Sequence, residues 1–73
     1  MVLSFKEGEY YEDFGTIVKY LGQDVITVGS TNQLVYMFVN QYGESVIVAR
    51  WQACHIWMTR ITDKSRIVLY GPS

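Results

Sequence analysis

The sequence predicts a single all-β domain over residues 1–73, either a small antiparallel barrel or a strongly twisted sheet of five to seven short strands. Short runs rich in Val, Ile, Thr, Tyr and Phe recur along the chain, and polar segments containing glycine separate them. This pattern is typical of antiparallel strands joined by turns. The length of 73 residues corresponds to one domain.

The segment 34–50, LVYMFVNQYGESVIVAR, has the strongest strand pattern in the chain. Two apolar runs flank a polar stretch that contains one glycine, which is typical of a β-hairpin. We expect Asn40 to lie opposite Ser45, which places Val39 opposite Val46. Both faces of this hairpin are then apolar, as in a pair of central strands that is covered on each side.

Two shorter strands are predicted before this hairpin. Residues 14–20 and 25–28 are rich in β-branched and aromatic side chains, and we expect a turn at 21–24 to join them. The preceding polar segment, residues 6–13, is expected to be a loop that follows a first edge strand at 2–5.

A short helical turn and a second hairpin are predicted after the central hairpin. The β-branched residues stop at 51–55, WQACH, where Ala and Gln tolerate a helix. Strands at 56–62 and 66–70 then flank a short polar loop at 63–65.

This order of elements is similar to the layout of SH3-like barrels. Closure into a barrel would remove the two edges that a small antiparallel sheet exposes. The similarity is one of layout, because the chain lacks the adjacent Trp-Trp pair and the late Pro-Xaa-Xaa-Tyr segment of peptide-binding SH3 domains. An open sheet that dimerises through an edge is the alternative architecture.

The composition is unusually apolar for so short a chain. Hydrophobic residues make up 49% of it and charged residues 18%, against about 25% charged residues in an average domain. A domain of this size buries only about 60% of the surface that its unfolded chain exposes. Some of the two Trp and six Tyr must therefore lie at least partly on the surface, and such surplus apolar surface often marks an interface.

Several features predict a cytosolic protein. The chain has one cysteine and no Asn-Xaa-Ser/Thr sequon, and its first segment turns acidic at Glu7 without an apolar stretch typical of a signal peptide. No apolar run approaches the roughly 20 residues that a membrane-spanning helix needs, so no membrane partner is expected.

The charges are distributed unevenly along the chain. Residues 1–44 hold two Lys against six Asp and Glu, whereas residues 45–73 hold four Lys and Arg against one Asp. We expect the two halves either to attract each other within the fold or to present two differently charged faces.

Cys54 and His55, the one thiol and the one imidazole, do not form a catalytic pattern. Adjacent residues point to opposite faces of a strand and do not face each other on a helix. They therefore cannot form the hydrogen bond that activates a thiolate. One Cys and one His also fall short of the ligands that zinc needs. The sequence predicts no enzyme activity, no metal site, no cofactor and no small-molecule substrate.

A non-catalytic protein-binding module fits the composition best, because Tyr, Trp and Arg supply most interface hot spots. The partner would be another protein or a second copy of the chain, forming a homodimer. The small size suits a regulator or inhibitor encoded by a phage or plasmid. An exposed strand edge at 25–28 or 67–70 offers a second mode, the addition of a strand from another chain. The candidate binding residues are Tyr42, Trp51, Trp57, Arg60 and Arg66.

Single-stranded nucleic-acid binding by the basic C-terminal hairpin is the alternative function. Small barrels bind single strands by stacking bases on aromatic side chains beside a basic groove, and Trp57 lies close in sequence to Arg60 and Arg66. A pI of about 5.6 opposes this function, because nucleic-acid-binding domains usually carry a strong positive footprint.

Overall fold

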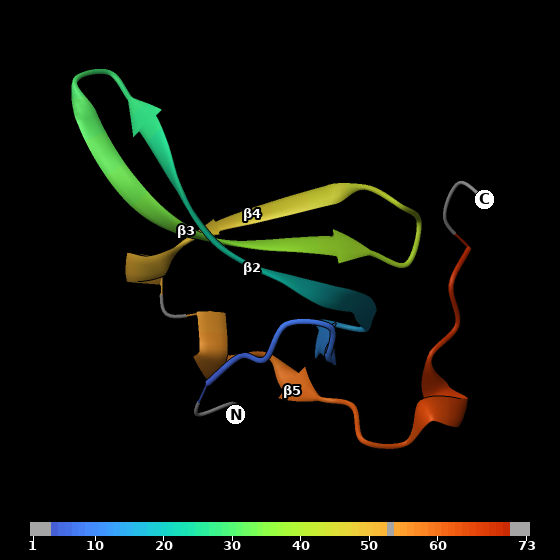
Figure 1. Ribbon diagram of the computed structural model, residues 1–73. Helices are drawn as coiled ribbons and strands as arrows, with labels where there is room; N and C mark the ends of the chain where they lie inside the picture. Colours follow the sequence, from blue (N-terminus) through green and yellow to red (C-terminus); the bar gives the residue numbers. More distant parts are fainter. Residues whose placement is uncertain (1–3, 53, 71–73) are drawn as a thin grey trace.

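The computed structural model describes residues 4–52 and 54–70. One antiparallel sheet of five strands runs in the order β4-β3-β2-β1-β5 (Figure 1). The strands are β1 (Tyr10–Asp13), β2 (Thr16–Val28), β3 (Thr31–Asn40), β4 (Ser45–Ala49) and β5 (Thr59–Arg60), and the 3₁₀-helices are η1 (Arg50–Gln52), η2 (Cys54–Ile56) and η3 (Lys64–Arg66). The predicted all-β class is confirmed. Of the two predicted architectures, the open sheet is present, with β4 and β5 at its edges.

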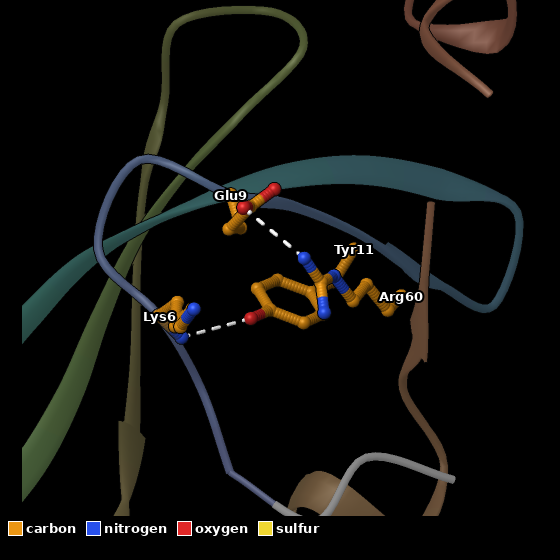
Figure 2. Close-up of polar contacts among 4 residues, drawn as sticks. All are labelled: Lys6, Glu9, Tyr11 and Arg60. Atoms are coloured by element: carbon orange, nitrogen blue, oxygen red, sulfur yellow. Dashed lines mark hydrogen bonds and ion pairs between the residues drawn. The ribbon is translucent and has the colours of Figure 1, made fainter. Parts of the chain in front are cut away.

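The core lies on one face of this sheet and is largely aromatic. Its buried residues are Tyr11, Val18, Tyr20, Phe38, Val48 and Met58. Phe5 packs against this cluster, with its ring centroid 5.0–5.3 Å from the rings of Tyr11, Tyr20, Tyr36 and Phe38. The backbone N–H of Lys6 donates to the hydroxyl of buried Tyr11 at 2.9 Å (Figure 2). This bond satisfies the polar end of the ring.

Strand β2 is one continuous strand of 13 residues, so the predicted turn at 21–24 is wrong. The pairing with β3 shifts between Tyr20 and Gly22, which leaves Leu21 as the extra residue of a β-bulge. Gly22 has a φ of 121°, a value that glycine adopts readily and other residues do not. The glycine that suggested a turn therefore serves a bulge instead.

The turn that ends β2 lies at Gly29 and Ser30, between the paired residues Val28 and Thr31. Gly29 has a φ of 64° and occupies the first central position of this two-residue turn, where type II′ turns require glycine. The distal parts of β2 and β3 consequently extend away from the other strands as a two-stranded projection (Figure 1).

The register of the β3–β4 hairpin differs by one residue from the prediction. Ser45 lies opposite Val39 rather than Asn40, and Val46 lies opposite Phe38. A shift of one residue exchanges the faces of one strand relative to the other. Moreover, β4 is an edge strand and Ile47 is exposed, so the hairpin is not a central pair covered on both faces.

The turn explains this register. The N–H of Asn40 donates to the carbonyl oxygen of Glu44 at 2.8 Å, and the Asn40 carbonyl accepts from the N–H of Gly43 at 3.0 Å. The Asn40 side-chain oxygen also accepts from the N–H groups of Tyr42 and Glu44, both at 2.9 Å. Asn40 and Glu44 thus close a three-residue loop, with Gly43 at a positive φ of 83°.

The predicted C-terminal hairpin is wrong. Only Thr59 and Arg60 form a strand in this region, and they pair with β1. The Asp63 side chain accepts from the N–H of Ser65 at 3.0 Å and from its hydroxyl at 2.7 Å. These bonds make Asp63 the N-cap of η3, so the segment forms a helical turn instead of a hairpin loop.

The segment after β4 forms the predicted helical turn, whereas the segment before β2 differs from the prediction. The helical turn predicted at 51–55 is confirmed by η1 and η2. The loop predicted at 6–13 is wrong in its second half, which forms β1. Residues 2 and 3 of the predicted first strand lie outside the described residues, and Ser4 and Phe5 are not in a strand.

Candidate protein-binding surface

The β1–β2 turn presents an aromatic side chain in an unusual backbone conformation. Asp13 pairs with Thr16, so Phe14 and Gly15 are the two central residues of the turn. Both have positive φ angles, 49° and 87°, as a type I′ turn requires. Asn, Asp and Gly normally occupy these positions, and Phe14 is the one non-glycine residue with a positive φ in the described part of the chain.

The ring of Phe14 is exposed and has one aromatic neighbour. Its side chain leaves the turn with 84% of the residue exposed. The indole of Trp57 stacks against it, with 6.2 Å between ring centroids and 20° between ring planes. This separation lies within the range of favourable aromatic pairs. We refer to these two residues as the Phe14–Trp57 pair.

Trp57 is held from two sides. Its indole N–H donates to the carboxylate of Asp13 at 2.9 Å, and the next residue, Met58, is fully buried in the core. The indole is therefore fixed against the end of β1 while 36% of Trp57 remains exposed. A fixed and partly exposed indole loses little side-chain entropy when a partner covers it.

Arg60 in β5 and Arg66 in η3 form ion pairs with acidic residues in or next to β1. Arg60 contacts Glu9 at 3.2 Å (Figure 2) and Arg66 contacts Glu12 at 2.7 Å. The basic C-terminal segment thus attracts the acidic N-terminal segment within the fold, one of the two arrangements that the charge distribution predicted. Both pairs are substantially exposed, so each is worth about 0–1 kcal/mol.

The structure brings three of the five predicted binding residues to one region. Trp57, Arg60 and Arg66 all contact acidic residues in or next to β1. Tyr42 lies apart, in the β3–β4 turn, where it stacks on Tyr70 with 5.6 Å between centroids.

Trp51, the fifth predicted residue, lies in η1 and is 75% exposed. It borders an open groove of about 460 Å³ together with Gln33, Leu34 and Arg50. Trp51 and the Phe14–Trp57 pair therefore belong to two separate surfaces.

Sequence reasoning missed Phe14 as a surface residue. It assigned Phe14 to the start of a strand, because the following residues alternate in a β pattern. The signal that would have found the turn is Gly15, which follows the strand-like YYED and precedes Thr16. A glycine between two strand runs is typical of a two-residue hairpin turn, and it leaves Phe14 at the other central position.

Two features of the titratable groups in the described residues bear on their chemistry. No group of three His, Cys, Asp or Glu side chains in that part of the chain could hold a metal ion. The pKa of Asp63 lies below its ordinary value of 3.8, chiefly because the Ser65 hydroxyl and then the Ser65 N–H donate to its carboxylate, with the Arg66 charge adding to this. Since these contacts cap η3, the lowered pKa reflects a structural role.

Comparisons with known protein families, with curated proteins and with solved structures found no match to this chain. Within residues 4–52 and 54–70, no helix is long and apolar enough to cross a membrane.

Proposed function

We propose that the protein is a non-catalytic protein-binding module whose contact centre is the Phe14–Trp57 pair. The observation that carries this proposal is the state of Phe14, a large apolar residue that is 84% exposed on a backbone with a φ of 49°. Arg60 of β5 and Arg66 of η3 form ion pairs with acidic residues in or next to β1, and we propose that they supply further guanidinium contacts to the partner.

Phe14 is unfavourable for the folded monomer in two ways. A left-handed backbone costs a non-glycine residue about 1–2 kcal/mol, and exposure forgoes the roughly 1.5–3 kcal/mol that burial of such a side chain provides. The stacking contact with Trp57 returns only about 0.5–1.5 kcal/mol. Strain at an exposed side chain is typical of functional positions, so we infer that Phe14 serves binding rather than stability.

The neighbouring indole defines the chemistry of the partner. Trp57 has its N–H already bonded to Asp13, so the pair offers only apolar ring surface to a partner. A protein with an apolar pocket that admits the Phe14 ring fits this surface. Buried aromatic anchors of this kind carry most of the binding energy in protein interfaces.

A substitution that leaves the turn intact tests this proposal. Phe14→Asn creates the Asn-Gly sequence that type I′ turns favour, so the fold is retained while the exposed ring is lost. Immobilised wild-type protein should retain a partner from lysate that the Phe14→Asn protein does not retain. Leu69→Asn, which removes another exposed apolar side chain, is the matched control and should retain the partner. Retention of the same proteins by wild type and Phe14→Asn would contradict the proposal.

The single-stranded nucleic-acid function stays a prediction that we do not adopt as the proposal. Its two central cations, Arg60 and Arg66, contact carboxylates of Glu9 and Glu12. Only residues 59–60 of the expected C-terminal hairpin form a strand. Quenching of tryptophan fluorescence by an oligonucleotide, weakening steeply with added salt, would reverse this preference.

The remaining parts of the proposal rest on size and composition. A short chain without a catalytic pattern suits a small regulator or inhibitor, encoded by a phage or plasmid, that acts in the cytosol. An SH3-like relationship stays a prediction from the order of the elements.

A further inference from the structure

The distal parts of β2 and β3 form a projecting arm, which we define as residues 24–35. Pairing between β3 and β4 ends at Val35 and Ala49. On the other side, the backbone hydrogen bonds between β2 and the N-terminal segment reach Tyr20, whose N–H donates to the carbonyl of Glu9 at 3.0 Å and whose carbonyl accepts from the N–H of Gly8 at 2.9 Å. Beyond its base at Asp24 and Val35, the arm therefore contains only two strands (Figure 1), and an isolated two-stranded ribbon is at best marginally stable in water.

The β2 strand of the arm has an open hydrogen-bonding edge. Val28 and Thr31 flank a two-residue turn, so they form a hydrogen-bonded pair. Alternation along the ladder then directs the N–H and C=O groups of Val25 and Thr27 away from β3. The N–H of Val25 agrees with this direction, because it donates to the Asp24 carboxylate at 2.8 Å. Among the described residues, no strand pairs with this edge.

The arm lacks the features that normally protect such an edge. Residues 25–34, VITVGSTNQL, contain no charged residue and no proline, although edge strands of monomeric proteins usually carry Lys, Pro or inward-pointing charges. Val25 and Val28 are each about half exposed, and Leu34 is also exposed. Asp24, at the base of the arm, is its one charged residue.

The molecule exposes more surface than a compact chain of its mass. Its accessible surface is 5047 Å², whereas a compact monomer of 8.4 kDa exposes about 4,600 Å². Its radius of gyration is 12.6 Å, against about 11 Å for a compact chain of this length. The monomer thus leaves several hundred Å² more surface uncovered than its mass requires, and the arm extends away from the main body of the sheet (Figure 1).

We propose that two copies of the chain associate through the β2 edges of their arms, as antiparallel strands related by a two-fold axis. A two-fold axis places the same edge on both sides of the contact. The β2 edge of the arm can pair with itself in this way, because each copy directs backbone N–H and C=O groups toward the other. The edge is also uncharged, so the two copies do not repel each other. The N–H of Val25 then transfers from the Asp24 carboxylate to a carbonyl of the second copy.

The charge at Asp24 selects the register of this pairing. A residue whose backbone N–H and C=O groups point away from β3 must pair with another such residue of the second copy. A two-fold axis that passes through Val25, Ile26 or Thr27 meets this condition. An axis at Val25 makes the two Asp24 carboxylates diagonal neighbours, about 7–8 Å apart. An axis at Thr27 instead places the turn glycine opposite a strand residue. The axis at Ile26 avoids both, because Val25 lies opposite Thr27 and Asp24 lies opposite Val28 of the second copy.

This inference concerns a different surface from the Phe14–Trp57 pair, so either proposal can fail without the other. The molecular mass of the wild-type protein should approach twice that of one chain in sedimentation equilibrium as the concentration rises. Val25→Lys places a charge on the paired edge and should keep the protein monomeric. Val68→Lys introduces the same change at another exposed valine and should leave the dimer intact. A wild-type monomer at every concentration, or a dimer that Val25→Lys does not weaken, would overturn the inference.

A cysteine cross-link tests the register directly. Directly opposed residues of a non-hydrogen-bonded antiparallel pair have Cα atoms about 4.5 Å apart, within the range of about 4.4–6.8 Å that a disulfide spans. Ile26→Cys in a Cys54→Ser background should therefore form a disulfide-linked dimer on mild oxidation. Ser30→Cys, at the tip of the arm, should not. Circular dichroism of each variant checks that the sheet is retained. Equal cross-linking of both variants, or of neither, argues against the proposed axis.

Discussion

The phenyl ring of Phe14 stacks on the indole of Trp57, with 6.2 Å between their centroids. This contact joins the β1–β2 turn to the segment that follows η2, two regions far apart in the sequence. The hydrogen bond from Trp57 to Asp13, at 2.9 Å, fixes the indole beside the turn. The pair is therefore held in place by the fold while its outer surface stays exposed, and it can be altered without disturbing the core.

Phe14→Asn should raise the stability of the isolated protein. The substitution removes a strain of about 1–2 kcal/mol at the left-handed position and loses a stacking contact worth about 0.5–1.5 kcal/mol. The midpoints of these two ranges give a net gain of about 0.5 kcal/mol, which corresponds to a rise in the melting temperature of roughly 2–4 °C for a domain of this size. Thermal unfolding followed by circular dichroism measures this change. A lower melting temperature would show that Phe14 supports the fold, contrary to our interpretation.

Gln41→Ala should be among the more destabilising polar substitutions. Gln41 is 8% exposed, and its side-chain oxygen accepts from the N–H of Ile17 at 2.8 Å. Removal of the side chain leaves that N–H without its partner, which costs about 1–3 kcal/mol.

Gln52→Ala provides the matched control for this substitution. Its side-chain oxygen also accepts a backbone N–H, that of Ala49, at 2.8 Å, but Gln52 is exposed and water can replace it. Urea unfolding of both variants should show the larger loss for Gln41→Ala. Equal losses would mean that the bond to Ile17 is not protected from solvent.

Gly22→Ala should destabilise the sheet by about 1–2 kcal/mol, because its φ of 121° is unfavourable for a residue with a Cβ. An added Cβ would also lie 2.7 Å from the carboxylate oxygen of Glu7. Glu7 is exposed, so its side chain can move aside and the backbone conformation sets most of the cost. Urea unfolding of Gly22→Ala in a Glu7→Ala background should therefore show nearly the same loss. Full recovery there would identify the contact with Glu7 as the cause.

Asp63 should make a small contribution to stability that depends on pH. Hydrogen bonds from Ser65 hold the folded-state pKa of Asp63 below its ordinary value of 3.8. A lowered pKa stabilises the folded state above the unfolded-state pKa, and this contribution disappears as the pH falls below 3.8 through the folded-state pKa. The effect is small because Asp63 is fully exposed.

The comparison of wild type with Asp63→Asn in urea unfolding, at neutral and at acidic pH, measures this contribution. The difference in stability between the two proteins should shrink at acidic pH. A difference that stays constant across the pH range would assign the role of Asp63 to something other than its charge.

The sequence predicted the fold class well and the roles of its glycines poorly. Runs of β-branched residues located parts of β2, β3 and β4, because such side chains fit a pleated, half-buried surface. A glycine in a sequence, however, indicates only that a positive φ is allowed, and it does not distinguish a turn from a bulge. Gly22 therefore suggested a turn where the structure has a bulge, and Gly15 was taken as part of a strand although it belongs to a turn.

The C-terminal segment shows a second limit. Residues 66–70, RIVLY, have a strand pattern but form no strand. Residues 59–60 pair with β1 instead, and the N–H of Tyr70 donates to the carbonyl of Gln41. Whether a segment pairs as a strand depends on which edges of the sheet are still free to accept it. The local sequence pattern contains no information about those edges. For the same reason, composition pointed to Trp57, Arg60 and Arg66 but could not place Phe14 beside Trp57.

The pairing of β1 with β5 has a consequence for the order of folding. Strands β2, β3 and β4 are joined by short turns, so their contacts close small loops and can form early. Tyr11 meets Arg60 only after almost the whole intervening chain is arranged, and the entropy of closing a loop grows with its length. We therefore expect the β2–β3–β4 meander to assemble first and the C-terminal segment to dock last, which completes the Phe14–Trp57 pair at the final step.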